Sequence, residues 1–234
     1  MGIEVRATKD VDANWRAIHR QLEDVLSAVE DLDLSDWFSF QISDAHTLQG
    51  EGDQGALRYS VTASLDGRVF ERVSLDVNIV GSEDMRPVEV VRARRNPFAF
   101  VDEPPLEIPM VPPAQQLAEK VHAYTRRYHD EQASSRAKDL FDMLVIAHQI
   151  ELPSAGILTD AVRQTFRIRK TTWPPELHQP LEWARPWLGF IADYPLPHDD
   201  LVSAFSALQQ FWAPILAGTA AAETIWRPEY WRWT

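Results

Sequence analysis

Apolar and polar residues alternate through much of the first half of the chain and follow a helical period in the second half. Two alternating runs, residues 57–65 and 73–79, flank Asp66-Gly67, a dipeptide that favours a two-residue hairpin turn. Residues 37–43 and 87–93 predict two further strands. Residues 13–31 instead place apolar side chains at helical spacing, so this segment is expected to form an amphipathic helix.

Five prolines in ten residues mark the segment 104–113, PPLEIPMVPP. Proline can continue neither a helix nor a central strand, so we expect the domain boundary here. Everything after it is expected to be helical, over 114–128, 136–149, 154–166, about 180–192 and 198–217. The pattern predicts an α+β, bilobed protein with an α/β domain over residues 1–105 and a helical domain over 106–234.

The composition is that of an ordinary packed protein of 234 residues, 45% of them hydrophobic. The absence of cysteine excludes disulfides, thiol catalysis and cysteine-ligated zinc. No apolar run approaches the roughly 18 residues of a membrane span, and the N-terminus lacks the apolar core of a signal peptide. The expected location is therefore the cytoplasm, with no membrane partner.

The net charge of −12 opposes nucleic-acid binding, because Lys and Arg supply most non-specific affinity for phosphate. The charge is unevenly distributed, however, since residues 116–170 carry nine Lys/Arg against seven Asp/Glu. The segment 165–175, TFRIRKTTWPP, interleaves basic and aromatic residues and suits a surface that follows a nucleic-acid backbone. A basic helix end before a Pro-Pro turn accounts for it equally well.

Three acidic residues on strand-like segments are candidate metal ligands: Asp10 and Asp12 in RATKDVD, and Asp76 in SLDVNI. Alternation places Asp10 and Asp12 on one face of a short strand, and Asp76 on the polar face of another. Carboxylates that converge from two strands can hold divalent metal against a triphosphate. Each also has a structural alternative: a helix N-cap for the pair, and a solvated sheet face for Asp76.

A second cluster lies on two predicted helices. Lys120 stands at the edge of an apolar stripe, and Asp139 and Asp142 share one face of the largely apolar helix KDLFDMLVIA. Buried carboxylates need partners, so an internal ion-pair network is the alternative to a catalytic role. The candidate partners are Lys120, Arg126, Arg136 and Lys138. No HExxH, GxSxG or Walker A motif is present, which argues against the enzymes that these motifs mark.

Together these motifs resemble those of the AbiEii/AbiGii nucleotidyltransferase toxins, including the mycobacterial MenT group. RATKDVD is similar to the end of their first motif, SLDVNI to the strand with the third acid, and LAEKVHAYTRR and SRAKDLFDM to the third and fourth motifs. The resemblance implies a mixed-sheet domain of the DNA polymerase β type followed by a helical domain.

The same resemblance implies roles for the candidate residues. Asp10, Asp12 and Asp76 would be metal ligands, with Asp76 alternatively the base that activates the acceptor hydroxyl. Arg6, Lys120 and Arg126 would contact the nucleotide, and Asp139 or Asp142 would complete the fourth motif.

The implied activity is Mg²⁺-dependent transfer of nucleotides from an NTP to an RNA 3′ end, specifically the tRNA acceptor end, restrained by a cognate antitoxin. Two alternatives stay open: a truncated remnant that acts as a binding or regulatory module, and a nucleotidyltransferase that modifies a protein. The family's first motif begins with a Gly-Gly or Gly-Ser pair at a helix start, whereas only MGIEVRATK precedes Asp10. The chain as written is therefore expected to bind NTP weakly.

Overall fold

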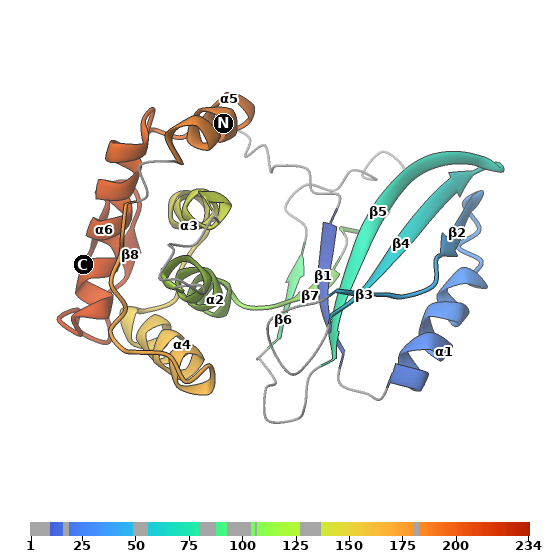
Figure 1. Cartoon of the computed structure of the whole chain (residues 1–234), viewed down its shortest axis with the longest axis horizontal. Helices are drawn as coiled ribbons and strands as arrows, with labels where there is room; N and C mark the ends of the chain where they lie inside the picture. The colour runs from blue at the N-terminus through green and yellow to red at the C-terminus, as the bar shows by residue number, and fades with distance from the viewer. Residues whose placement is uncertain are drawn as a thin grey trace. The chain divides into compact units, whose positions relative to one another are not determined.

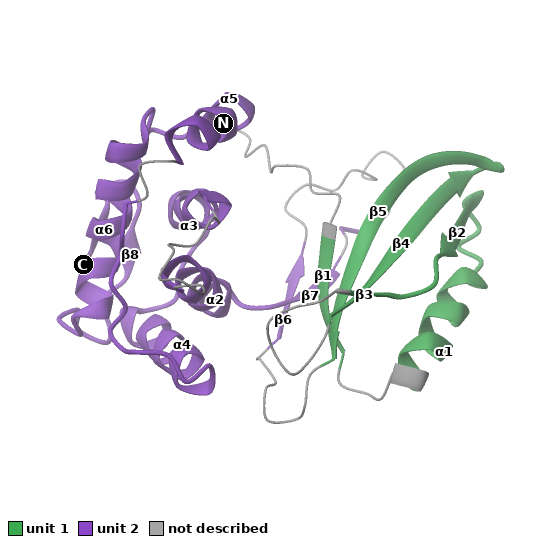
Figure 2. Ribbon diagram, in the orientation of Figure 1, with its two compact units in different colours: residues 1–85 green, residues 86–234 purple. Residues whose placement is uncertain are grey.

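The structure is a computed structural model that describes residues 10–15, 19–48, 56–79, 88–92, 104–105, 107–126, 137–179 and 183–234. It divides into two compact units, Met1–Met85 and Arg86–Thr234, coloured green and purple in Figure 2. This division falls about 20 residues before the expected boundary at 105/106. The reason is that strand β6 (Glu89–Arg92) pairs with β7 (Glu107–Met110), which leads into the first helix of unit 2.

Unit 1 contains one mixed sheet. Its main path has the order β1-β5-β4-β2, and the short strand β3 also pairs with β4. β1 runs parallel to β5, and the other pairings are antiparallel. The expected α+β class with a mixed sheet is therefore confirmed. The strands are β1 (Asp10–Trp15), β2 (Phe38–Ile42), β3 (His46–Leu48), β4 (Ala56–Leu65) and β5 (Arg68–Ile79).

The hairpin between β4 and β5 forms at the expected Asp66-Gly67 turn. Both turn residues have positive φ, 49° and 74°, as a tight two-residue hairpin turn requires. A register shift between Ala63 and Ser64 follows, because Ala63 pairs with Glu71 while Ser64 pairs with Val69. This β-bulge leaves Phe70 as the extra residue and aligns the apolar faces of the two strands.

Helix α1 (His19–Glu30) covers the apolar face of this sheet (Figure 1). Its Leu22 is 2% exposed and packs in one small core with Tyr59 of β4 and Val77 of β5. The prediction of a helix over 13–31 was wrong at its start, because Ala13 and Trp15 belong to β1. Their apolar side chains fit either period, and pairing with β5 decides in favour of the strand.

Unit 2 is mainly helical and has the larger core. The helices are α2 (Pro113–Thr125), α3 (Ala137–Gln149), α4 (Ala155–Ile168), α5 (Ala184–Asp193) and α6 (Leu201–Leu216). Leu117, Leu140, Leu158 and Trp212, one from each of four helices, are fully buried in it. Asp200 caps α6 by accepting hydrogen bonds from the backbone N–H groups of Val202 and Ser203 at 2.8 and 2.9 Å.

Two short β-pairs accompany the helices of unit 2, and the second of them, β8 (Trp226–Arg227) with β9 (Arg232–Trp233), corrects the expectation that everything after the segment 104–113 is helical. β7 lies inside the proline-rich segment, with Pro109 opposite Val90, and a two-stranded ribbon tolerates proline because both strands are edges. β8 pairs with β9 near the C-terminus. Among the helices described above, none combines the length and apolar character needed to cross a bilayer.

Candidate functional site

The polar face of the unit 1 sheet brings together side chains from three adjacent strands. Asp12 of β1 is directly opposite Asp76 of β5, which in turn is directly opposite Arg58 of β4. Residues opposite each other on neighbouring strands share a face and stand about 4.8 Å apart. Arg58, Asp76 and Asp12 therefore form a row across the sheet, on the face away from the core under α1.

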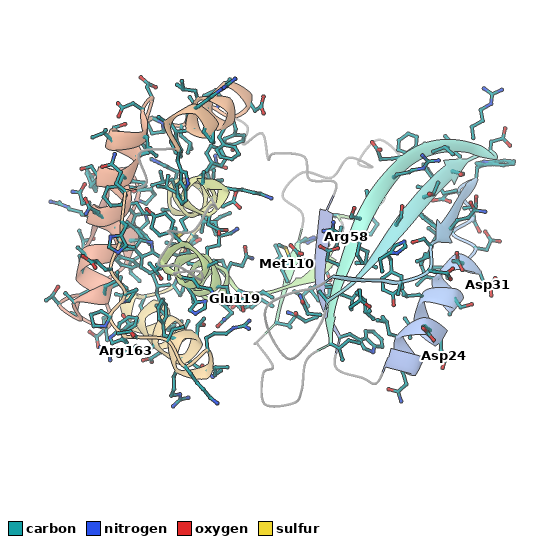
Figure 3. The ribbon with its side chains drawn as sticks, in the orientation of Figure 1. Asp24, Asp31, Arg58, Met110, Glu119 and Arg163 are labelled. Carbon is teal, nitrogen blue, oxygen red and sulfur yellow. The ribbon has the colours of Figure 1, made fainter. Side chains whose placement is uncertain are left out.

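Arg58 binds the carboxylate of Asp76 with two hydrogen bonds. Arg58 Nε donates to Asp76 Oδ1 at 2.7 Å, and Nη2 donates to Oδ2 at 2.6 Å. Figure 3 shows Arg58 on the sheet of unit 1. These hydrogen bonds, reinforced by the charge of the guanidinium, lower the pKa of Asp76 although partial burial opposes the shift. Asp76 is consequently held as an anion at neutral pH.

Asp10 occupies the position of β1 that pairs with Ser74, two residues before Asp12 on the same strand. For Asp10 the structure describes the backbone alone, and Arg6 lies outside the described residues. By strand periodicity the positions of Asp10 and Asp12 belong to the same face of the sheet.

This row of side chains suits a hard divalent cation in its donor chemistry. Carboxylate oxygens are the ligands that Mg²⁺ prefers, and Asp12 and Asp76 supply two carboxylates against the single positive charge of Arg58. Within the described side chains, no group of three or more His, Asp or Glu is placed to hold a metal ion. Asp12 and Asp76 thus fit as part of a metal site, to which the position of Asp10 could add a third ligand.

The second predicted cluster lies entirely within unit 2, where Lys120 joins α2 to α3. Lys120 Nζ donates a hydrogen bond to Asp142 Oδ2 at 2.7 Å and lies 3.9 Å from Asp139 Oδ1. The side chain of Lys120 is 26% exposed and that of Asp139 11%. The ion-pair network anticipated as an alternative is therefore present, and the Lys120 side chain in it is only partly buried.

Arg126 directly follows α2, six residues after Lys120, and is exposed. Partial burial, together with the positive charges of Arg169 and Arg126, lowers the pKa of the nearby His122 to about 4, although Glu119 opposes the shift. Arg126 thus belongs to a cationic region at the end of α2, apart from the Lys120 ion pairs.

A family comparison identifies the chain. The sequence profile described as "Nucleotidyl transferase AbiEii toxin, Type IV TA system" matches residues 1–213, which include every candidate residue named above. The chain belongs to this AbiEii family. The resemblance seen in the Asp-x-Asp, Lys120 and Asp139/Asp142 motifs is thereby confirmed at the level of the family.

Structural comparison of this AbiEii protein gives a distant match. The solved structure "MenT4, nucleotidyltransferase toxin Rv2826c from Mycobacterium tuberculosis H37Rv" is 18% identical, with a TM-score of 0.43. The match covers 71% of the AbiEii chain described here and 53% of the MenT4 chain, so the aligned part spans about half of MenT4. None of the curated proteins compared with the chain matches it.

Arg58 is the residue of this AbiEii site that sequence reasoning missed. The signal for it was present, because apolar residues occupy odd positions on both sides of a two-residue turn. A regular hairpin with that turn would pair odd positions with even ones, since Leu65 pairs with Arg68. Only a bulge restores apolar-to-apolar pairing, and the same one-residue shift places Arg58 opposite Asp76 instead of Leu75.

Proposed function

We propose that this AbiEii protein transfers nucleotides from an NTP to the 3′ end of an RNA, with the tRNA acceptor end as the substrate of choice. The observation that carries the proposal is the pairing of Asp12 with Asp76 on adjacent parallel strands, on the polar face of the sheet. Family membership supports the reaction class. A cognate antitoxin is the expected partner in a type IV toxin–antitoxin system.

In the proposed reaction, the 3′-hydroxyl oxygen of the RNA attacks the α-phosphorus of the NTP, and the bond to the pyrophosphate oxygen breaks. Magnesium bound at Asp12, Asp76 and Asp10 would supply stabilisation of the attacking and leaving oxygens. Asp12 and Asp76 would hold the cation by their anionic oxygens, and Arg58 keeps Asp76 ionised and fixed in orientation.

The same contact argues against Asp76 as the general base. An efficient base has a pKa near the working pH, whereas Arg58 lowers the pKa of Asp76 below the usual value of a free carboxyl group. Asp76 therefore suits a ligand role, and the proton of the attacking hydroxyl is assigned to another acceptor or to solvent.

For unit 2 we propose that Lys120 contacts the triphosphate, with Asp142 as the residue that positions it. Asp142 Oδ2 makes the short contact with Lys120 Nζ, whereas Asp139 lies farther away and is more deeply buried. This geometry favours Asp142 as the functional acid of the fourth motif and Asp139 as a support for the helix. Arg126, exposed at the end of α2, and Arg6 are the further candidates for contacts with the NTP.

The experiment is a transfer assay with purified chain, Mg²⁺, each α-³²P-labelled NTP in turn, and bulk tRNA. Label on the tRNA 3′ end is expected, and Asp12→Asn should abolish it because one carboxylate ligand is lost. The matched control is Asp24→Asn, which removes the same charge from an exposed position of α1, on the opposite side of the sheet. This control should label tRNA as the unchanged chain does.

The outcomes separate the alternatives. Label on protein instead of RNA would favour the protein-modifying nucleotidyltransferase. Absence of label from every NTP and acceptor, together with intact folding, would sink the enzyme proposal in favour of a binding or regulatory module. Equal loss of label in Asp12→Asn and Asp24→Asn would show that the Asp12–Asp76 pair is not the reaction centre.

A further inference from the structure

A cationic face at the C-terminal end of α4 has no part in the site described so far. Residues 161–175 contain Arg163, Arg167, Arg169 and Lys170, and no Asp or Glu. All four basic side chains are exposed, whereas Val162, Thr165 and Phe166 form the buried side of the same helix. In a protein with a net charge of −12, this local excess of positive charge needs an explanation.

A second helix packs beside this cationic face. α2 and α4 pack against each other, and Gln115 Nε2 donates a hydrogen bond to Thr165 Oγ1 at 3.1 Å across their contact. Arg126, at the end of α2, and Arg169, at the end of α4, both lower the pKa of the half-buried His122, whereas Glu119 of α2 raises it. We call the four basic residues at the end of α4, Arg163, Arg167, Arg169 and Lys170, the arginine face.

Helix electrostatics explains only part of this arrangement. One or two cations in the last turn are favourable because they interact with the negative end of the helix dipole. Arg163 lies well before the last turn, however, so the helix dipole does not account for it, and Arg167 four residues later repels it. A multiply charged anionic ligand would convert this repulsion into binding energy.

The side chain of Arg163 is also held in place before any ligand arrives. Its guanidinium carbon lies 5.7 Å from the centre of the Trp173 ring, and Trp173 packs edge-on against Phe166 with ring centres 5.6 Å apart. Figure 3 shows Arg163 on α4. A cation–π contact restrains the arginine while its N–H groups stay available for phosphate, so less conformational entropy is lost on binding.

From these observations we infer that the arginine face binds the phosphodiester backbone of the RNA acceptor. This inference rests on the proposed function, because it takes RNA to be the acceptor. A row of exposed arginines on a rigid helix matches regularly spaced phosphates, and arginine forms paired hydrogen bonds with phosphate oxygens. Such contacts give affinity without sequence specificity, and the affinity falls as salt rises.

The test measures binding of fluorescently labelled bulk tRNA to the Asp12→Asn chain, without NTP, between 50 and 250 mM salt. Arg163→Gln, Arg167→Gln and Arg169→Gln together should weaken binding about 10- to 100-fold near 0.1 M salt. They should also lower the slope of log K against log salt by about 2 to 3. The unfolding temperature of each variant is measured in parallel.

The matched control removes three arginines elsewhere in unit 2, Arg185→Gln, Arg227→Gln and Arg232→Gln. All three are exposed, and Arg232 lies over the Tyr230 ring at 5.4 Å, much as Arg163 lies over Trp173. The control should bind tRNA within about twofold of the parent, with the same salt slope. A second triple variant, with lysine at positions 163, 167 and 169, should retain most of the slope because the charges remain.

Several results would overturn the inference. Equal weakening by both glutamine triples would show that overall charge, not the arginine face, attracts RNA. Unchanged tRNA binding by the arginine-face triple would exclude the surface. So would a triple variant that loses binding to anionic phosphatidylglycerol vesicles but still binds tRNA as the parent does. If the triple variant unfolds, Arg167→Gln by itself should lower the slope by about one, and an unchanged slope counts against the inference.

Because transfer is not measured in this experiment, the two proposals can fail separately. If tRNA binds through the arginine face and no NTP is ever transferred, the function proposed above fails and the binding surface stands. If transfer to RNA occurs and binding ignores the arginines, the surface fails and the enzyme proposal stands.

Discussion

Arg58→Gln is the most direct test of the contact by which Arg58 holds Asp76 in its ionised form. The change removes both donors to Asp76, at 2.7 and 2.6 Å. A charge-assisted hydrogen bond between buried groups contributes about 1.5–3 kcal/mol. The Asp76 side chain is 14% exposed but that of Arg58 is 45% exposed, so solvent screens part of the attraction. We therefore expect the free energy of opening unit 1 to fall by about 1 kcal/mol at pH 7.

The pH dependence of this loss has a definite sign. Because Arg58 lowers the pKa of Asp76 in the folded state, the pair stabilises unit 1 fully above the unfolded pKa of about 3.9. The stabilisation disappears as the pH falls through the lower folded pKa. The difference between the parent and Arg58→Gln should therefore be constant between pH 7 and 5 and should shrink below about pH 4.

Hydrogen exchange of peptides from β4 and β5 is the suitable assay, because it reports on unit 1 separately from unit 2. Arg72→Gln is the control, since Arg72 is exposed, lies on β5 and stands opposite Thr62 instead of an acid. Equal protection in Arg58→Gln and Arg72→Gln at pH 7 would refute the reasoning. So would a difference between them that persists undiminished at pH 3.

Two further predictions concern the stability of unit 2. Seven of the nine tryptophans lie in this unit, so its unfolding in urea can be followed by intrinsic fluorescence. Lys120→Met should lower the free energy of unfolding of unit 2 by about 1–3 kcal/mol, because it leaves Asp142 without its 2.7 Å partner. Lys138→Met, at an exposed position of α3, should lower it by less than about 0.5 kcal/mol. Similar costs for the two lysines would contradict the ion-pair network. His122, with its pKa lowered to about 4, should destabilise the folded state as the pH falls from 7 through 6.5 toward 4, because the unfolded chain binds the proton more readily. His122→Phe should remove about 1–2 kcal/mol of that loss between pH 7.5 and 5, and an unchanged pH dependence would rule out a buried neutral His122.

Local pattern determined most of the secondary structure of this protein. The five helices of unit 2 begin and end within about four residues of their expected positions, and Asp66-Gly67 forms the expected turn. These features are encoded over a few residues, by helical spacing of apolar side chains and by a dipeptide that tolerates positive φ. The start of α1 was misplaced because Trp15 satisfies both the helical and the strand period.

The sequence by itself determined the candidates for the chemistry: the Asp-x-Asp pair, Asp76, Lys120 and the acids of α3 are all recognisable by type and spacing. Only the tertiary structure decided how they meet. The parallel pairing of β1 with β5 sets Asp12 beside Asp76 across some 60 residues of chain, and a single bulge turns Arg58 toward that pair. Periodicity specifies which face of a strand is buried, whereas partner and register depend on the energy of the whole sheet and on the cost of closing the loops between its strands.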